Sequence, residues 1–137
     1  MIQFVCGIKG SGKTKHMVSM ANECIEQAAG HVVFIDDTAE RMFDIHRSIR
    51  FINVGEYQID SQERLLGFLA GLLAGDYDIK TVFIDHFLRI LKTNNPAAQE
   101  EFLCRLDSVL EPFDVQIIVS VSADTETLPA YFRERLV

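Results

Sequence analysis

Short, continuous apolar runs alternate along this chain with longer stretches of helical periodicity. Each run is rich in Val, Ile and Phe and ends at a polar or turn-forming residue, as buried strands do. The runs predict strands at residues 2–6, 32–36, 51–54, 81–85 and 115–121. Strands that are apolar along their whole length indicate a parallel sheet that is covered on both faces.

The segments between these strands predict helices, and some carry the residues that begin one. Asp60 with Glu63 three residues later is typical of a helix start, and Asn95 before Pro96 is a second such signal. We expect helices at residues 13–29, 60–75, 96–111 and 128–136, and a short polar helix at residues 38–48.

The alternation of strands and helices predicts an α/β fold. The expected architecture is a doubly wound, three-layer α/β/α sandwich around a mainly parallel five-stranded sheet. The length of 137 residues fits one domain that spans residues 1–137. Ligands of such sheets bind beyond the carboxyl ends of the strands, so functional residues are expected just after each strand.

Composition and charge narrow the classes of partner. With 48% hydrophobic and 24% charged residues the chain is typical of a globular protein. The net charge of −7 argues against a uniformly basic nucleic-acid binder. The apolar stretch 65–74 is too short to span a membrane, and the N-terminus lacks a secretory signal pattern. Three widely spaced cysteines suit a reducing compartment. We therefore expect a cytoplasmic protein without nucleic-acid or membrane partners.

A glycine-rich segment after the first predicted strand carries the strongest chemical signal. It matches the pattern G-x-x-x-x-G-K-[ST] with residues Gly7, Ile8, Lys9, Gly10, Ser11, Gly12, Lys13 and Thr14. Glycines let backbone N–H groups turn inward around an anion, and the N-terminus of the next helix favours negative charge. Lys13 can reach terminal phosphates, and the Thr14 hydroxyl can ligate Mg²⁺. The segment therefore predicts a phosphate-binding loop.

Through this loop the sequence resembles the P-loop NTPases. The resemblance implies that the chain binds a nucleoside triphosphate together with Mg²⁺, and the lack of a guanine-reading NKxD-like motif favours ATP. In that family an aspartate at the end of an apolar strand is associated with the Mg²⁺ ion. Asp85 (TVFID) and Asp36 (VVFID) both have this form. We prefer Asp85 as the metal residue beside Thr14, because it lies two strands beyond Asp36.

The layout of the other strands resembles the RecA-like branch of this superfamily, and the chain is also similar to short, stand-alone bacterial P-loop proteins. The branch implies a catalytic acid just after the second strand, where Asp37 and Asp36 stand, with Glu40 as a further alternative. It implies a polar γ-phosphate sensor at Ser120 or Ser122. It also implies that the sensor strand lies between the metal strand and the P-loop strand.

One departure concerns the glutamate that activates the attacking water in many related ATPases. His86 directly follows Asp85, and no glutamate occupies the expected place after the second strand. Slow hydrolysis of the nucleotide is our leading hypothesis, and a non-hydrolysing switch or assembly module is the alternative. A small-molecule kinase ranks third, because Arg89 and Arg105 lie in helical patterns and not in a lid.

The expected strand order also bears on partners. It leaves the first strand near one end of the sheet, and too few residues follow residue 121 to add a covering hairpin. Because an open apolar edge favours association, we expect a homo-oligomer or a protein partner. Arg133 or Arg135 is a candidate to complete a neighbouring subunit's site, as trans arginines do in this superfamily.

Overall fold

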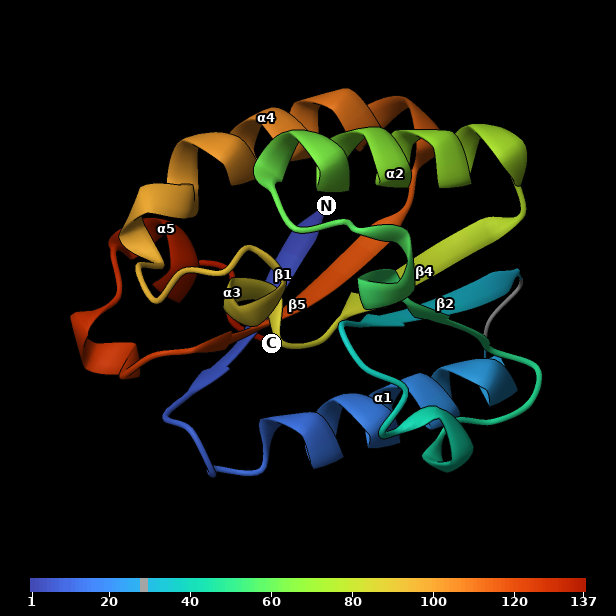
Figure 1. Ribbon diagram of the computed structural model, residues 1–137, viewed down its shortest axis with the longest axis horizontal. Helices are drawn as coiled ribbons and strands as arrows, with labels where there is room; N and C mark the ends of the chain where they lie inside the picture. Colours follow the sequence, from blue (N-terminus) through green and yellow to red (C-terminus); the bar gives the residue numbers. More distant parts are fainter. Residues whose placement is uncertain (28–29) are drawn as a thin grey trace.

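Five parallel strands form the central sheet of the computed structural model, which describes residues 1–27 and 30–137 (Figure 1). The strands are β1 (Ile2–Gly7), β2 (His31–Asp36), β3 (Arg50–Asn53), β4 (Ile79–Ile84) and β5 (Gln116–Ser122). Their order across the sheet is β1-β5-β4-β2-β3, and every neighbouring pair is parallel. β5 therefore lies between β1 and β4, and β1 lies at one end of the sheet, as the sequence predicted.

Helices cover both faces of the sheet, which confirms the predicted three-layer sandwich (Figure 1). α1 (Lys13–Gln27) lies on one face, while α2 (Gln62–Gly75) and α4 (Glu100–Leu110) lie side by side on the other. The short helices are α3 (Phe87–Ile90) and α5 (Ala130–Arg133). Turns of 3₁₀ helix are η1 (Met42–Asp44), η2 (Val54–Tyr57), η3 (Ala97–Gln99), η4 (Glu111–Phe113) and η5 (Thr125–Thr127). Within the described ranges, the helices are too short or too polar to cross a membrane.

The side chains of each strand divide between two cores, one on each face of the sheet. In β2, Val33 and Ile35 belong to the core that α2 and α4 cover. Val32 and Phe34 belong to the core on the α1 side, together with Met17 of that helix. All five side chains are at most 1% exposed. Burial on both faces is the physical cause of the continuous apolar runs in the sequence.

The predicted helix at residues 38–48 is wrong, because this segment forms a loop that contains only η1. The side chain of Asn22 on α1 donates to the Asp44 carbonyl at 3.0 Å and accepts the His46 N–H at 2.9 Å. These bonds, with the buried side chain of Ile45, hold the segment against α1 and the core on that face in an irregular conformation. Tertiary contacts here outweigh a weak local preference for helix.

Other helix boundaries differ from the predictions for local reasons. α2 begins after Ser61, whose hydroxyl accepts the Arg64 N–H at 3.2 Å, whereas Asp60 forms an ion pair with the Arg64 guanidinium. The η3 turn precedes α4, and the last helix is limited to α5 because the following residues leave the helix to pair with β1. The predicted end of the first helix near residue 29 lies outside the described residues.

The outer edge of β1 is partly covered by residues 135–137. The Phe4 N–H donates to the Arg135 carbonyl at 2.8 Å, and the Val137 N–H donates to the Phe4 carbonyl at 2.9 Å. The Arg135 guanidinium lies 4.0 Å from the ring centre of Tyr131 and donates to the Tyr131 carbonyl. The prediction of an open edge is therefore wrong at Phe4, and Arg135 is held by its own chain.

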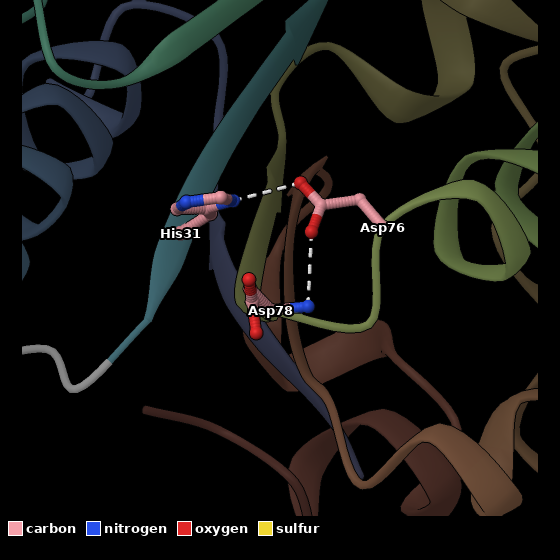
Figure 2. Close-up of side chains that lie close together, drawn as sticks. All are labelled: His31, Asp76 and Asp78. Carbon is pink, nitrogen blue, oxygen red and sulfur yellow. Dashed lines mark hydrogen bonds and ion pairs between the residues drawn. The ribbon is translucent and has the colours of Figure 1, made fainter.

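A group of three side chains joins the start of β2 to the turn between α2 and β4 (Figure 2). The His31 Nδ1 lies 2.7 Å from an Asp76 carboxylate oxygen, and the other Asp76 oxygen accepts the Asp78 N–H at 2.9 Å. The hydrogen bond between His31 and Asp76 is the main cause that raises the pKa of His31 and lowers the pKa of Asp76. The group lies at the amino ends of the strands, away from the carboxyl edge where ligands of such sheets bind.

We predict that His31 titrates above its ordinary pKa of about 6.5 and that Asp76→Asn lowers the His31 pKa toward that value. The raised His31 pKa adds stability that is complete at low pH and disappears as the pH rises through it. The lowered Asp76 pKa adds stability that disappears as the pH falls through it, so the pair contributes most between these two pKa values. An NMR titration of His31 in both proteins checks this, and identical His31 pKa values would contradict the contact.

Candidate functional site

The predicted phosphate-binding loop runs from the end of β1 to the start of α1. Gly10 and Gly12 have φ angles of +84° and +90°, a left-handed conformation that side chains rarely tolerate. A Cβ on Gly7 would lie 2.6 Å from the Ser11 Oγ, so this position is also closely packed. The loop therefore has the tight curvature that the glycine pattern predicted, and it leads directly into the N-terminus of a 15-residue helix.

Lys13 is the first residue of α1 and lies back over the loop. Its Nζ donates to the Ile8 carbonyl at 3.0 Å. Partial burial lowers the pKa of Lys13, while the nearby Asp85 carboxylate opposes this shift. Burial also raises the pKa of the neighbouring Cys6 thiol to about 11, which makes Cys6 a neutral packing residue and not a nucleophile at pH 7.

Two buried carboxylates lie where the neighbouring strands β2 and β4 end. Asp36 and Asp85 are each 1% exposed. The Ser120 hydroxyl from β5 donates to the Asp85 Oδ1 at 2.5 Å, and the His86 main-chain N–H donates to the same carboxylate oxygen at 2.9 Å. Among the described residues, the Oδ2 atoms of both aspartates have no hydrogen-bond partner. Parallel pairing of β2 with β4 thus places two acids, far apart in the sequence, at one point of the sheet edge.

His86 connects these carboxylates to the phosphate-binding loop. Its Nδ1 lies 2.9 Å from the Asp36 Oδ1 and 3.5 Å from the Asp85 Oδ2, and its Nε2 lies 3.4 Å from the Thr14 hydroxyl. The hydrogen bond with Asp36 is the main cause that raises the pKa of His86. Burial raises the pKa of Asp36, and the His86 hydrogen bond opposes that shift.

Arg89 on α3 binds the acid that follows β2. Its Nε and one terminal nitrogen each donate to Asp37 at 2.7 Å, and that terminal nitrogen lies 3.8 Å from Asp36. Burial raises the pKa of Asp37, but the hydrogen bonds from Arg89 and the bond with Asp36 outweigh burial and lower its pKa overall. Both oxygens of Asp37 are therefore engaged, and they accept from a planar guanidinium in a bidentate arrangement.

These elements border a cavity of about 1110 Å³ at the carboxyl edge of the sheet. The loop and α1 form one wall, and the segment after β4 forms the opposite wall. Six lining residues are basic: Lys9, Lys13, Lys15, Arg41, Arg89 and Lys92. This concentration of positive charge in a chain of net charge −7 favours an anionic ligand.

The cavity separates the predicted site residues into two groups. The metal candidates Thr14 and Asp85 line it, as do Lys13 and the alternative sensor Ser122. The other sensor candidate, Ser120, does not line the cavity, because its buried hydroxyl bonds to Asp85. Asp36, Asp37 and Glu40 do not line it either. Sequence reasoning correctly placed Arg89 in a helix and noted His86 only as a departure, but it predicted neither residue at the cavity that both line.

The buried carboxylate oxygens and the nearby hydroxyl are the groups that could bind a metal ion at this site. Oxygen ligands suit Mg²⁺, and a hydroxyl and a carboxylate are available from Thr14 and Asp85. The partnerless Oδ2 of Asp85 is the kind of buried acceptor that a cation would satisfy. The residues therefore fit a divalent cation.

Solved structures with a similar fold identify the architecture. The flagellar accessory protein FlaH from Methanocaldococcus jannaschii matches with a TM-score of 0.60 at 10% identity over 97% of this chain and 65% of that chain. PCH-2 from C. elegans matches with a TM-score of 0.55 at 16% identity over 98% and 33% of the two chains. The pCW3 conjugation coupling protein TcpA, in a structure with ATPgS, matches with a TM-score of 0.50 at 14% identity over 98% of this chain and 46% of that chain.

These similarities show the P-loop NTPase fold and, at such low identity, the fold alone. This chain spans between one third and two thirds of the length of those three proteins. No protein-family model matches the chain, and no curated protein matches its sequence. The function must therefore be argued from the site itself.

We predict that Ser120→Ala lowers the free energy of unfolding by about 1–3 kcal/mol, because a buried carboxylate loses a hydroxyl donor. The matched control is Ser122→Ala, which removes an exposed hydroxyl two residues further along β5 and should change stability by less than about 0.5 kcal/mol. Urea denaturation of both variants measures the difference. Equal losses in the two variants would contradict a supporting role for Ser120.

Proposed function

We propose that this protein binds a nucleoside triphosphate, ATP, together with Mg²⁺ through residues 7–14 and hydrolyses it slowly. The observation that carries this proposal is the loop between β1 and α1, whose left-handed Gly10 and Gly12 border a basic cavity that also holds Asp85. A curled loop of N–H groups, a helix N-terminus and a lysine together favour a polyphosphate over a single carboxylate. The P-loop NTPase fold supports the same ligand class.

The proposed roles follow from position. Lys13 and the loop N–H groups bind the phosphates, and Ser122 contacts them from the end of β5. Thr14 and Asp85 hold Mg²⁺, which would supply charge neutralisation at the phosphates. Ser120 acts through Asp85, because its hydroxyl orients that carboxylate. Asp36 contributes from behind the cavity through its contact with His86.

The rate is proposed to be low for a specific reason. Fast hydrolysis of the terminal phosphoanhydride needs a group that orients the attacking water. The predicted candidate, Asp37, has both oxygens in hydrogen bonds with Arg89. The strand order, with β5 between β1 and β4, supports a relationship to the RecA-like branch, whose members position this water with an acid.

The alternative is a nucleotide-binding switch or assembly module that does not hydrolyse. The pairing of Asp37 with Arg89 favours it, since the acid predicted to act as the base is then engaged elsewhere. In such a protein the nucleotide would change the conformation of the segment after β4, which contributes one wall of the cavity. Release of inorganic phosphate from ATP by the purified protein distinguishes the two functions.

We predict that Lys13→Ala abolishes stabilisation by ATP and leaves the fold intact. A ligand at 100 times its Kd stabilises the parent protein by about 2.7 kcal/mol, and this shift should disappear in the variant. Thermal unfolding with and without Mg²⁺ and ATP measures it. Lys80→Ala, which removes an exposed lysine from β4 outside the cavity, is the matched control. Full stabilisation of Lys13→Ala by ATP would overturn the proposed function.

We also predict that Asp85→Asn removes the effect of Mg²⁺ on ATP affinity, because the variant lacks an anionic metal ligand. Asp36→Asn should retain that effect and mainly lower the rate of hydrolysis. Calorimetric titration with ATP, with and without Mg²⁺, gives the affinities, and phosphate release gives the rate. The reverse pattern would assign the metal to Asp36.

A further inference from the structure

We propose that His86 is a catalytic residue that orients the attacking water, with Asp36 as its positioning residue. This inference rests on the proposed function, and it names the group that stands in for the missing glutamate. His86 follows the buried Asp85 directly, and its imidazole lines the cavity beside the phosphate-binding loop.

His86 is the cavity-lining residue best suited to orient a water molecule, because the other side chains there are less suitable as acceptors or have another proposed role. An orienting group must accept a hydrogen bond from the water, and lysine and arginine side chains have no acceptor. Among the described residues that line the cavity, the only carboxylate and the only imidazole are Asp85 and His86. Asp85 is the proposed metal ligand. His86 is then the remaining strong acceptor, because hydroxyl and amide oxygens are weaker ones.

The two ring nitrogens of His86 have different partners, and these partners fix the orientation of the ring. The Asp36 Oδ1 already accepts the Asp37 N–H at 2.7 Å and therefore acts as an acceptor toward the His86 Nδ1 as well. In the neutral imidazole the Nδ1 atom then carries the hydrogen, and the Nε2 atom presents a lone pair. That lone pair points to the side of the loop, since the Thr14 hydroxyl lies 3.4 Å from Nε2. A buried carboxylate that fixes an imidazole in this way is the arrangement found in other hydrolases.

The main chain of His86 is held in an unfavourable conformation that keeps the ring in place. Its φ and ψ angles are +56° and +43°, in the left-handed region that few residues other than Gly, Asn and Asp adopt. The His86 N–H donates to both the Asp85 carboxylate and the Ser120 hydroxyl at 2.9 Å, and the His86 carbonyl accepts the Ile90 N–H. Strain of this kind persists where surrounding contacts enforce it, and it is concentrated at functional sites.

The proposed step is hydrolysis of the terminal phosphoanhydride. The water oxygen forms a bond to the γ-phosphorus, and the bond from that phosphorus to the bridging oxygen breaks. The diphosphate leaves with the electron pair of the broken bond, and the products are nucleoside diphosphate, inorganic phosphate and one proton released to solvent. His86 Nε2 accepts a hydrogen bond from the water as this bond forms. Its contribution is orientation, which supplies much of the catalysis in phosphoryl transfer.

Two substitutions separate catalysis from structural support. His86→Asn retains a donor near the Nδ1 position for Asp36 and tolerates the left-handed backbone, but it has no atom at the Nε2 position. His86→Gln reaches toward that position, but it suits the backbone less well. We expect His86→Asn to bind ATP within about twofold of the parent Kd and to lose at least about tenfold in kcat. We expect His86→Gln to melt at a lower temperature and still to recover part of the lost kcat.

The rank order decides between the two roles, because a purely structural histidine would make His86→Asn the more active variant. His16→Asn, on α1 outside the cavity, is the matched control and should retain the parent Kd and kcat. A kcat for His86→Asn equal to that of the parent overturns the inference and leaves the proposed function in place. A parent that binds ATP without turnover also overturns the inference, and it replaces slow hydrolysis with the non-hydrolysing alternative. A parent that does not bind nucleotide overturns the proposed function itself.

A measurement on the unmodified protein keeps the inference testable if the variants do not fold. The nitrogen-15 resonance of His86 Nε2 reports its hydrogen bonding. We expect this resonance to differ between the complex with Mg²⁺ and ADP and the complex with Mg²⁺ and a non-hydrolysable ATP analogue, because the ordered water requires the γ-phosphate. An identical resonance in the two complexes would overturn the role of Nε2.

Discussion

Two carboxylates are buried at the ends of neighbouring strands, and the free-energy cost of burying them determines which groups surround them at the carboxyl edge of the sheet. Asp36 and Asp85 are almost completely buried, and an uncompensated charge in such a place is strongly disfavoured. The compensating groups are the Ser120 hydroxyl, the main chain and ring of His86, and the guanidinium of Arg89. All of these groups therefore lie at the carboxyl edge of the sheet, where the glycine-rich loop 7–14 also lies.

These groups do not satisfy every oxygen of the two carboxylates, and the unsatisfied oxygens affect both the stability of the protein and the chemistry of the site. Each aspartate retains one buried oxygen without a partner among the described residues. A closed hydrogen-bond network would stabilise the apoprotein but would offer nothing to a cation. The open oxygen of Asp85 and the left-handed backbone of His86 both reduce stability locally, and features of this kind are concentrated at functional sites.

The order of the strands sets the spacing of this site. β5 separates the strand that leads to the glycine-rich loop from the strand that leads to Asp85, so the loop and the acid line one cavity from either side of the end of β5. The same order leaves β1 at the end of the sheet. There residues 135–137 pair with Phe4, which covers part of an edge that would otherwise favour association.

The sequence by itself determined the α/β class, the five strands and the position of the loop, because these depend on local patterns. A strand buried on both faces must be apolar throughout, and a backbone that curls around phosphate needs glycine at positions such as Gly10 and Gly12. It also predicted Asp85, which follows an apolar run directly, as the metal residue, and that role remains a prediction. Only the tertiary structure decided the partners of these residues. The pairing of Asp37 with Arg89, the contact of Ser120 with Asp85 and the place of His86 between Asp36 and Thr14 join segments separated by 35 to 72 residues. Local patterns carry no information on such contacts, because they arise when parallel strands bring distant chain segments to one edge.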